Sequence, residues 1–528
     1  FLVTHKNVDS KVQNPIRQET NMSYYPRAMP ESNRVRGDKM ARTVRSRIRP
    51  LVFLVVIGLS ASALVVVFAN SFLSSSSIWP LSSVSILITS DERAGKGAAS
   101  NSNVDTMRIG ALLPLTGVAS STGKSTLAAL NMVVEDVNEN FSMNNSSLRV
   151  ELDVVDTESD PAISLEKLKL LAEEGIKTII GPATSAELEA VKDYADNNDV
   201  ILLSHSSTAP SLAIEGDNVF RFVPDDTHQA NAISRLMWDD GIRIVIPFWR
   251  NDVYGSELLQ AVKKNFENMG GQLDINNETR YAPRTGQLAA SLYRINFALW
   301  DKDLRNLDSR VQQAISKYGA DKVGVYLISL DEVSPIFIQA HSYPALSKVK
   351  WYGSDGSVLN KGLVKNHDSA HFAVNTSFYN PIFRIDYQND NQKLDRVLHG
   401  IRNEIGRDPS PYSAVAYDIL WVIAKAENST MYNDHITNGS YDINIDGRSA
   451  LSDGLDASTI ILGNNDNAIP KEELVHSANS YKGITGNTTL NRMGDRERAE
   501  YDIMAIRYLN NNDETPFVWQ KVDSYIGN

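Results

Sequence analysis

Short apolar runs alternate with longer segments of helical periodicity throughout residues 108–203. Within residues 125–138, for example, leucine and valine recur at intervals that place them on one side of a helix. Strands that alternate with helices of this length favour a parallel sheet covered by helices on both faces, with ligands bound outside the carboxyl ends of the strands. We expect strands at residues 108–113, 149–155, 178–180 and 200–203, and helices at residues 125–138, 164–174 and 186–197.

A second series of the same kind begins at residue 229. The chain has 528 residues, which is too many for one compact domain and enough for two well-buried ones. The helix expected at residues 412–427 follows, and its periodicity does not say which sheet it covers. The predicted fold class is therefore α/β, with two lobes that are each a parallel sheet flanked by helices. The second series consists of helices at residues 229–239, 256–269, 310–318 and 333–340 and strands at residues 242–248, 322–327 and 350–352.

Hydroxyl-bearing residues follow two neighbouring strands of the first series. Thr184 and Ser185 come after the strand at residues 178–180, and residues 204–210 (SHSSTAP) follow the next strand. Each cluster leads toward a helix, whose free backbone N–H groups and positive dipole end attract anions. We therefore expect an anion cradle that holds a small carboxylate.

Composition excludes several partners and chemistries. The net charge is −12 and the main body carries no basic block, which argues against nucleic acid as a partner. The chain has no cysteine, so disulfides, thiolate metal sites and cysteine nucleophiles are excluded. His367 and His371 have the spacing of two metal ligands on a helix, but no third ligand is evident nearby, and a solvated polar segment is the preferred interpretation. We expect no metal and no cofactor.

Two further motifs resemble catalytic sites only in part. Residues 122–125 (TGKS) resemble a phosphate-binding loop, but five residues separate Gly117 from Gly123 where that loop has four. Ser204 and Ser206 flank His205, yet neighbours in a strand point to opposite faces and cannot pair as nucleophile and base. The chain also lacks a Gly-x-Ser-x-Gly elbow. We expect no enzymatic activity.

The residues before this body differ from it in composition. Residues 51–69 contain no charge over 19 positions, which is enough to cross a bilayer as a helix, and basic residues precede them. That asymmetry favours an N-terminus inside the cell membrane and a body outside it. We expect a basic cytoplasmic tail at residues 1–50, a transmembrane anchor at residues 51–70 and a flexible serine-rich stalk at residues 71–105. The alternative is a cleaved signal peptide, which would leave a secreted protein.

Seven short motifs occur in order along the body: residues 109–117 (IGALLPLTG), Gly181-Pro182 with Ser185, residues 206–210 (SSTAP), 252–255 (DVYG), 353–356 (GSDG), 481–486 (YKGITG) and 494–496 (GDR). This order resembles the type I periplasmic binding protein family, in the branch of leucine/isoleucine/valine-binding proteins and related amide and urea receptors. The resemblance extends over residues 107–525. It implies two lobes, joined by several crossings of the chain, that close on a ligand. By resemblance, lobe 1 is residues 106–228 and 382–480, and lobe 2 is residues 229–381 and 481–528.

The resemblance also assigns candidate ligand-binding residues. Ser185 and Thr208 would offer hydroxyls, and Ser206 and Thr208 backbone groups, to the α-carboxylate and α-ammonium of an amino acid. Tyr254 and Asp355 would come from the opposite lobe, with the aspartate pairing with the ammonium. Each residue also has a plainer interpretation, because serine and threonine cap helices, Gly-Ser-Asp-Gly forms turns, and a tyrosine can lie on the surface of a lobe.

One position departs from the pattern of the family. Ser329 stands where relatives place an aromatic residue in the side-chain pocket, which puts specificity for a branched aliphatic side chain in doubt.

Together these features predict an extracytoplasmic solute-binding protein. It would capture an amino acid, branched-chain or similar, in a cleft between lobes and deliver it to the membrane permease of an ABC importer. The alternatives are the ligand-binding ectodomain of a sensory receptor and a receptor for an amide or urea.

Overall fold

The computed structural model describes residues 105–144, 146–275, 279–282, 300–385, 392–437, 469–497, 500–509 and 516–526, which lie within one compact unit running from Gly97 to Asn528. The expected cytoplasmic tail, the membrane anchor and the stalk up to residue 104 lie outside these residues. Within the described ranges, no helix has both the length and the apolar character that a membrane crossing needs.

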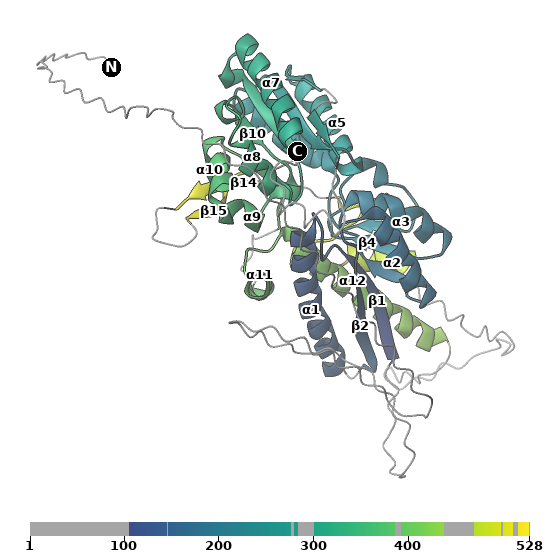
Figure 1. Ribbon diagram of the computed structural model, residues 1–528. Helices are drawn as coiled ribbons and strands as arrows, with labels where there is room; N and C mark the ends of the chain where they lie inside the picture. The colour runs from purple at the N-terminus through teal and green to yellow at the C-terminus, as the bar shows by residue number, and fades with distance from the viewer. Residues whose placement is uncertain are drawn as a thin grey trace, which may run out of the picture. The chain divides into compact units, whose positions relative to one another are not determined.

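The first sheet has five strands, all parallel, in the order β2-β1-β3-β4-β5 (Figure 1). Its strands are β1 (Asp105–Leu113), β2 (Leu148–Asp156), β3 (Thr178–Ile180), β4 (Ile201–Ser204) and β5 (Val219–Arg221), and its helices are α1 (Ser120–Met143), α2 (Pro161–Glu173), α3 (Ser185–Asn197), α11 (Gln392–Ile405), α12 (Pro411–Thr437) and α13 (Lys471–Asn479).

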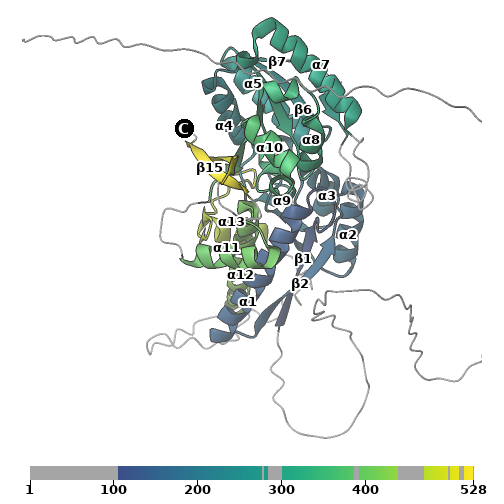
Figure 2. The same ribbon diagram turned by 60° about the vertical axis from the view of Figure 1, so that its left-hand side comes forward.

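Helices cover both faces of this sheet. Ala111 packs in one core with α1, α11 and α12, and the next residue, Leu112, packs in another with α2 and α3. Figure 2 shows α11, α12 and α13 gathered beside α1. Burial of alternate residues on opposite faces explains why these strands are continuously apolar in sequence.

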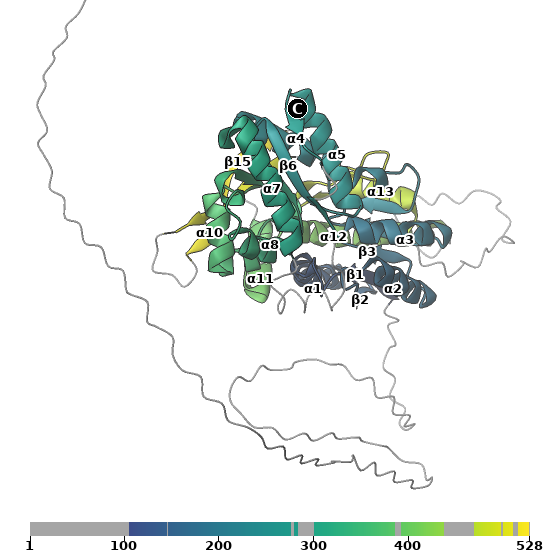
Figure 3. The ribbon, with the colours of Figure 1, turned by 45° about the horizontal axis from the view of Figure 1, so that its top comes forward.

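The second sheet follows the order β15-β14-β11-β10-β9-β6-β7, with β8 also paired to β6. In Figure 3, α7 and α8 lie on one side of β6 and α4 and α5 lie on the other. Its strands are β6 (Ile244–Arg250), β7 (Gln272–Leu273), β8 (Arg280–Tyr281), β9 (Val323–Ile328), β10 (Lys350–Tyr352), β11 (Tyr379–Phe383), β14 (Glu500–Tyr508) and β15 (Phe517–Ile526), and its helices are α4 (Asp226–Asp239), α5 (Val253–Asn268), α7 (Asp301–Tyr318), α8 (Val333–Ala340), α9 (Lys361–Lys365) and α10 (His367–Asn375).

The structure corrects the expectation that the second sheet is wholly parallel. Strands β14 and β15 are antiparallel to each other, and β14 is antiparallel to β11. The physical reason is that β14 and β15 are too close in sequence for the crossover connection that parallel strands need.

Every strand and helix expected from the alternation is present, although some bounds differ. The largest differences are in α12, which ends at Thr437 and not at residue 427, and in α7, which begins at Asp301 and not at residue 310. Its first half carries many charges, which dilute the apolar pattern, while Leu304 and Leu307 are fully buried. The lobe boundaries remain predictions. Near one of them, the amides of Ile484 and Thr485 donate to Asp418 of α12, beside the first sheet.

The connection from β3 to α3 requires a glycine. Gly181 has a φ of +107°, and a Cβ there would lie 2.3 Å from the carbonyl oxygen of Leu112. Glycine alone accepts both the dihedral angle and the close approach. The chain can therefore turn directly from the end of β3 into the start of α3.

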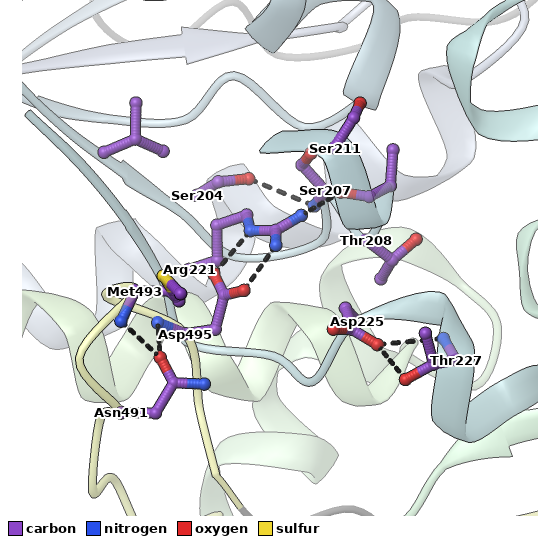
Figure 4. Close-up of polar contacts among 12 residues, drawn as sticks. Ser204, Ser207, Thr208, Ser211, Arg221, Asp225, Thr227, Asn491, Met493 and Asp495 are labelled. Atoms are coloured by element: carbon purple, nitrogen blue, oxygen red, sulfur yellow. Dashed lines mark hydrogen bonds and ion pairs between the residues drawn. The ribbon is translucent and has the colours of Figure 1, made fainter. Parts of the chain in front are cut away.

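A buried ion pair fixes the turn after β4. Arg221, at the end of β5, donates through Nε to Oδ1 of Asp495 (2.6 Å) and through Nη2 to Oδ2. Its Nη1 donates to the carbonyl oxygen of Ala209 (2.6 Å). Figure 4 shows Arg221 between Asp495 and the turn that carries Ser207 and Thr208. The pair thus ties three distant segments together at the edge of the first sheet.

The Arg221–Asp495 pair gives a test of stability. Replacing Asp495 with alanine leaves a fully buried guanidinium without its carboxylate, so we expect the free energy of unfolding to fall by about 3 to 5 kcal/mol in denaturant titrations. The control is Glu215→Ala, which removes an exposed partner of Arg492 and should cost less than about 1 kcal/mol. Equal losses in the two variants would contradict this role.

Candidate functional site

A cavity of about 490 Å³, which includes solvent at its mouth, lies where the elements of the two sheets meet. Its walls come from the turn before α1, the starts of α3 and α12, the turn after β4, the end of β6 and the start of α5. The lining residues are Ala119, Thr122, Ala183, Thr184, Ser185, Ala186, Ser206, Arg250, Asp252, Tyr254, Leu330, Asp355, Gly356 and Tyr412.

Asp355 is the acidic centre of this cavity. Its Oδ1 accepts hydrogen bonds from the Tyr254 hydroxyl (2.6 Å) and the Gly356 amide (2.8 Å), and its Oδ2 accepts one from the Tyr412 hydroxyl. Among the described residues, no lysine or arginine forms an ion pair with it. A carboxylate held only by neutral donors keeps its capacity to attract a cation.

A second carboxyl group, that of Asp226, lies behind Asp355. Gln229 bridges the two residues, because its side-chain amide donates to Asp226 Oδ1 (2.9 Å) and its Oε1 accepts from the Asp355 amide (3.0 Å). Burial, and then the charge of Asp355, raise the pKa of Asp226. Burial and the same charge also raise the pKa values of Tyr254 and Tyr412, so both hydroxyls stay protonated as donors. This end of the cavity therefore favours a cationic group.

The opposite wall is the start of α3. Thr184 caps the helix by accepting from the Glu187 amide (3.3 Å), and Glu187 Oε2 accepts from the Thr184 amide (3.1 Å). Ser185 and Ala186 follow in the first turn, where backbone amides have no partner within the helix. The helix therefore presents donors to the cavity at these positions, which suits an anion.

Ser185 is engaged by the turn after β4. Its Oγ accepts from the amides of Thr208 (3.1 Å) and Ala209 (3.2 Å) and from the hydroxyl of Ser207 (3.1 Å). These bonds use its lone pairs, so its hydrogen is the group that it can offer to a ligand.

The structure brings four of the five predicted site residues to the cavity: Ser185, Ser206, Tyr254 and Asp355. Thr208 does not line it, because its amide points to Ser185 and its carbonyl oxygen accepts from the Asp226 amide (2.8 Å). Ser329 does not line it either; it is fully buried, and the next residue, Leu330, takes the place in the wall.

Five polar lining residues lie outside the predicted site: Thr122, Thr184, Arg250, Asp252 and Tyr412. Tyr412 lies in the first turn of α12, a helix whose sheet the periodicity could not assign. Arg250 ends β6, two residues before the motif at residues 252–255. The rule that ligands bind at the carboxyl ends of parallel strands could have identified Arg250.

Hydrogen bonds cross between the two groups of elements beside the cavity. The amide and hydroxyl of Ser121, in α1, donate to Asp331 (2.9 and 2.6 Å), and the Asp331 amide donates to Val118 (3.0 Å). The amide of Ser211 donates to Glu257 of α5 (2.9 Å). With the Tyr412–Asp355 bond, these contacts join the two groups of elements beside the cavity.

The remaining motifs have structural roles or lie apart from the cavity. His367 and His371 stack at 5.7 Å on α10, where both are exposed. The described part of the chain contains no group of three or more metal-ligating side chains placed to hold an ion. At Gly123 a Cβ would lie 2.2 Å from the carbonyl oxygen of Pro114, so this glycine serves close packing of α1.

His205 is buried behind the turn after β4. Its Nε2 lies 3.0 Å from the Thr126 hydroxyl, and its Nδ1 has no partner among the described residues. The hydroxyls of Ser204 and Ser206 donate instead to the carbonyl oxygens of Pro182 and Ala183. Burial lowers the pKa of His205 to about 3, so the ring is neutral near pH 7.

Because of His205, we expect the free energy of unfolding to depend on pH. In the unfolded chain the ring takes up a proton below its ordinary pKa of 6.5, whereas in the folded chain it does so only near 3, so stability is present above pH 6.5 and falls as the pH is lowered toward 3. At pH 4.5 this linkage costs about 2.7 kcal/mol. We expect the unfolding free energy of the His205→Gln variant to lose correspondingly less between pH 7 and pH 4.5 than that of the wild type. His399→Gln, at an exposed position, should follow the wild type; identical pH profiles for all three proteins would contradict the prediction.

Comparisons with known proteins bear on this geometry. The family described as "Receptor family ligand binding region" matches residues 125–508. An uncharacterized protein of Methanocaldococcus jannaschii is 27% identical over 77% of this chain and 88% of its own length. Leu/Ile/Val-binding protein BraC3 of Rhizobium johnstonii is 27% identical over 32% of this chain, and Glutamate receptor 2.4 of Arabidopsis thaliana is 27% identical over 32%. The chain spans only 46% and 18% of these last two relatives.

Among solved structures, a leucine-binding protein from Thermotoga maritima superposes with a TM-score of 0.54. The match covers 80% of this chain and 99% of that protein at 16% sequence identity. The likeness concerns the fold.

Proposed function

The chain belongs to the receptor family ligand binding region, with the type I periplasmic binding fold of the leucine-binding proteins, and from this membership we propose that it is an extracytoplasmic solute-binding protein that captures an amino acid. The observation that carries the proposal is Asp355. It is a buried carboxylate, held by the hydroxyls of Tyr254 and Tyr412, that faces the cavity without a basic partner among the described residues.

An amino acid zwitterion matches the two ends of the cavity. Its α-ammonium would pair with Asp355, and its α-carboxylate would accept from the first turn of α3 and from Ser185. Away from bulk water, each charge-assisted hydrogen bond contributes roughly 1.5 to 3 kcal/mol. We keep Ser206 in the site as a lining residue and Thr208 as the residue whose amide orients Ser185.

Ligand binding would stabilise the closed form. The anion end belongs to elements of the first sheet and Asp355 to those of the second, so that only the closed arrangement satisfies both charges of the ligand. The Tyr412–Asp355 bond already spans the two sides. In this proposal residues 106–228 and 382–480 form lobe 1, and residues 229–381 and 481–528 form lobe 2.

We further propose that the protein is held at the outer face of the cell membrane by residues 51–70 and delivers its ligand to an ABC permease. The second candidate is a sensory ectodomain, which the similarity to a plant glutamate receptor favours. Both functions use the same cavity and differ in the membrane partner.

Asp355 gives the first test of this function. We expect calorimetry to detect binding of at least one amino acid from a panel of amino acids, short amides and urea. Asp355→Asn should weaken that binding by roughly 10- to 150-fold, because a charge-assisted bond to the ammonium is lost. The exposed Asp321→Asn variant is the control and should bind as the wild type does. Failure of every amino acid to bind the wild type would sink the proposal.

An uptake assay distinguishes delivery of the ligand to a permease from a sensory function. In cells that lack the chain, we expect uptake of the radiolabelled ligand at concentrations near the dissociation constant to fall to background. Expression of the wild type should restore it, and the Asp355→Asn variant should not. Unchanged uptake, together with loss of a response to the ligand, would favour the sensory ectodomain.

A further inference from the structure

The α-carboxylate and α-ammonium of the proposed ligand do not use the whole wall of the cavity. The start of α3 with Ser185 receives the carboxylate, and Asp355 with its two tyrosines receives the ammonium. Apart from Ser206, the lining residues that remain for the side chain of the ligand are Ala119, Thr122, Leu330, Gly356, Arg250 and Asp252. Arg250 is the one cation among the lining residues.

Arg250 is held in place by two carboxylates. Its Nε donates to Asp252 Oδ2 (2.6 Å) and its Nη1 donates to Glu332 Oε1 (2.8 Å). The side chain is 4% exposed, and Tyr281 donates to the same oxygen of Glu332 (3.1 Å). A guanidinium has five N–H donors in one plane, and no described residue accepts a hydrogen bond from Nη2. The fixed fork therefore retains donors beside the cavity.

Both carboxylate oxygens of Asp252, by comparison, already accept hydrogen bonds. Its Oδ2 accepts from Arg250, and its Oδ1 accepts from the Gly255 amide (2.9 Å) as the cap of α5. Leu330, Ala119 and Thr122 complete this part of the wall. Arg250 is its one cationic donor.

The charges around Arg250 decide which acceptor suits it. Asp252 and Glu332 together compensate its positive charge, so a third carboxylate would meet a region that is not positive overall. An alkyl side chain would cover the free N–H groups without accepting from them, which costs roughly 1 to 3 kcal/mol for a buried donor left unpaired. A neutral acceptor satisfies the donors without adding charge.

We propose that Arg250 is a specificity-determining residue that selects amino acids whose side chain carries a neutral hydrogen-bond acceptor, such as a carboxamide, over branched aliphatic and acidic side chains. This inference rests on the proposed function, because it assumes that an amino acid occupies the cavity.

Three ligands of nearly equal shape test the proposal on the unaltered protein. Asparagine, leucine and aspartate share one branching pattern and differ in what the side chain offers to Arg250. We expect calorimetry to give asparagine an affinity at least about 10-fold higher than those of leucine and aspartate. If the cavity suits a longer side chain, the same advantage should appear for glutamine over methionine and glutamate. Leucine or aspartate binding as tightly as asparagine, with the same result in the longer set, would overturn the inference.

Alanine separates failure of this inference from failure of the proposed function. It carries the same α-carboxylate and α-ammonium but reaches no side-chain partner. If alanine binds and the carboxamides show no preference, the inference fails and the proposed function stands. If no amino acid binds, the proposed function fails first.

The Arg250→Lys variant tests the residue itself. Lysine keeps a positive charge for Asp252 and Glu332, but its single ammonium cannot also serve the ligand with the geometry of the fork. We expect the preference for the carboxamide over its apolar and acidic counterparts to fall by about 10-fold. The matched control is Arg384→Lys, because Arg384 also joins two carboxylates, Glu500 and Asp502, away from the cavity. An undiminished preference in Arg250→Lys would overturn the assignment.

Discussion

The buried ion pair between Arg221 and Asp495 is the interaction that positions the side of the cavity formed by elements of the first sheet. One guanidinium joins β5, the carbonyl of Ala209 and the loop that returns near the end of the chain. Because Ala209 and Thr208 donate their amides to Ser185, the charge pair also determines where that hydroxyl lies at the start of α3. An ion pair outside the cavity thus sets the orientation of a group inside it. Burying such an ion pair costs desolvation energy, and removing one partner costs more, because a charge is left buried without compensation. Other arrangements of these segments are therefore disfavoured.

The cavity itself separates charge into two ends. Neutral donors surround Asp355, an acid with a raised pKa lies behind it at Asp226, and backbone amides of α3 form the opposite wall. No basic side chain among the described residues forms an ion pair with Asp355, so its charge stays available to a cation. Arg250 differs, since it is already compensated by Asp252 and Glu332. If the proposed function holds, charge would orient the ligand in this cavity and hydrogen bonding would select among ligands.

Local patterns in the sequence were sufficient for the strands, the helices and much of the cavity wall. Apolar runs predicted the strands because their residues are buried on both faces, and the order of motifs placed Ser185, Ser206, Tyr254 and Asp355 in one site. Tyr412 escaped prediction because its partner Asp355 lies 57 residues away, and helical periodicity does not tell which end of α12 reaches the cavity. Thr208 was predicted to line the cavity but does not. A motif specifies a residue type and not the direction of its backbone amide, and the Thr208 amide donates to Ser185. The antiparallel edge of the second sheet was missed because no pattern near residue 500 indicates which strand β14 will join.

That antiparallel edge has a consequence for the order in which the protein can assemble. β11 pairs with β10 on one side, but its other side is completed only by β14, which starts more than a hundred positions further along the chain. Chains are made from the N-terminus, so β11 has an open hydrogen-bonding edge until the last strands have been synthesised. An open edge next to a buried core is a site for pairing with other chains. Strands β14 and β15 contribute nothing to the cavity wall, but they cover this edge of β11 in the folded protein.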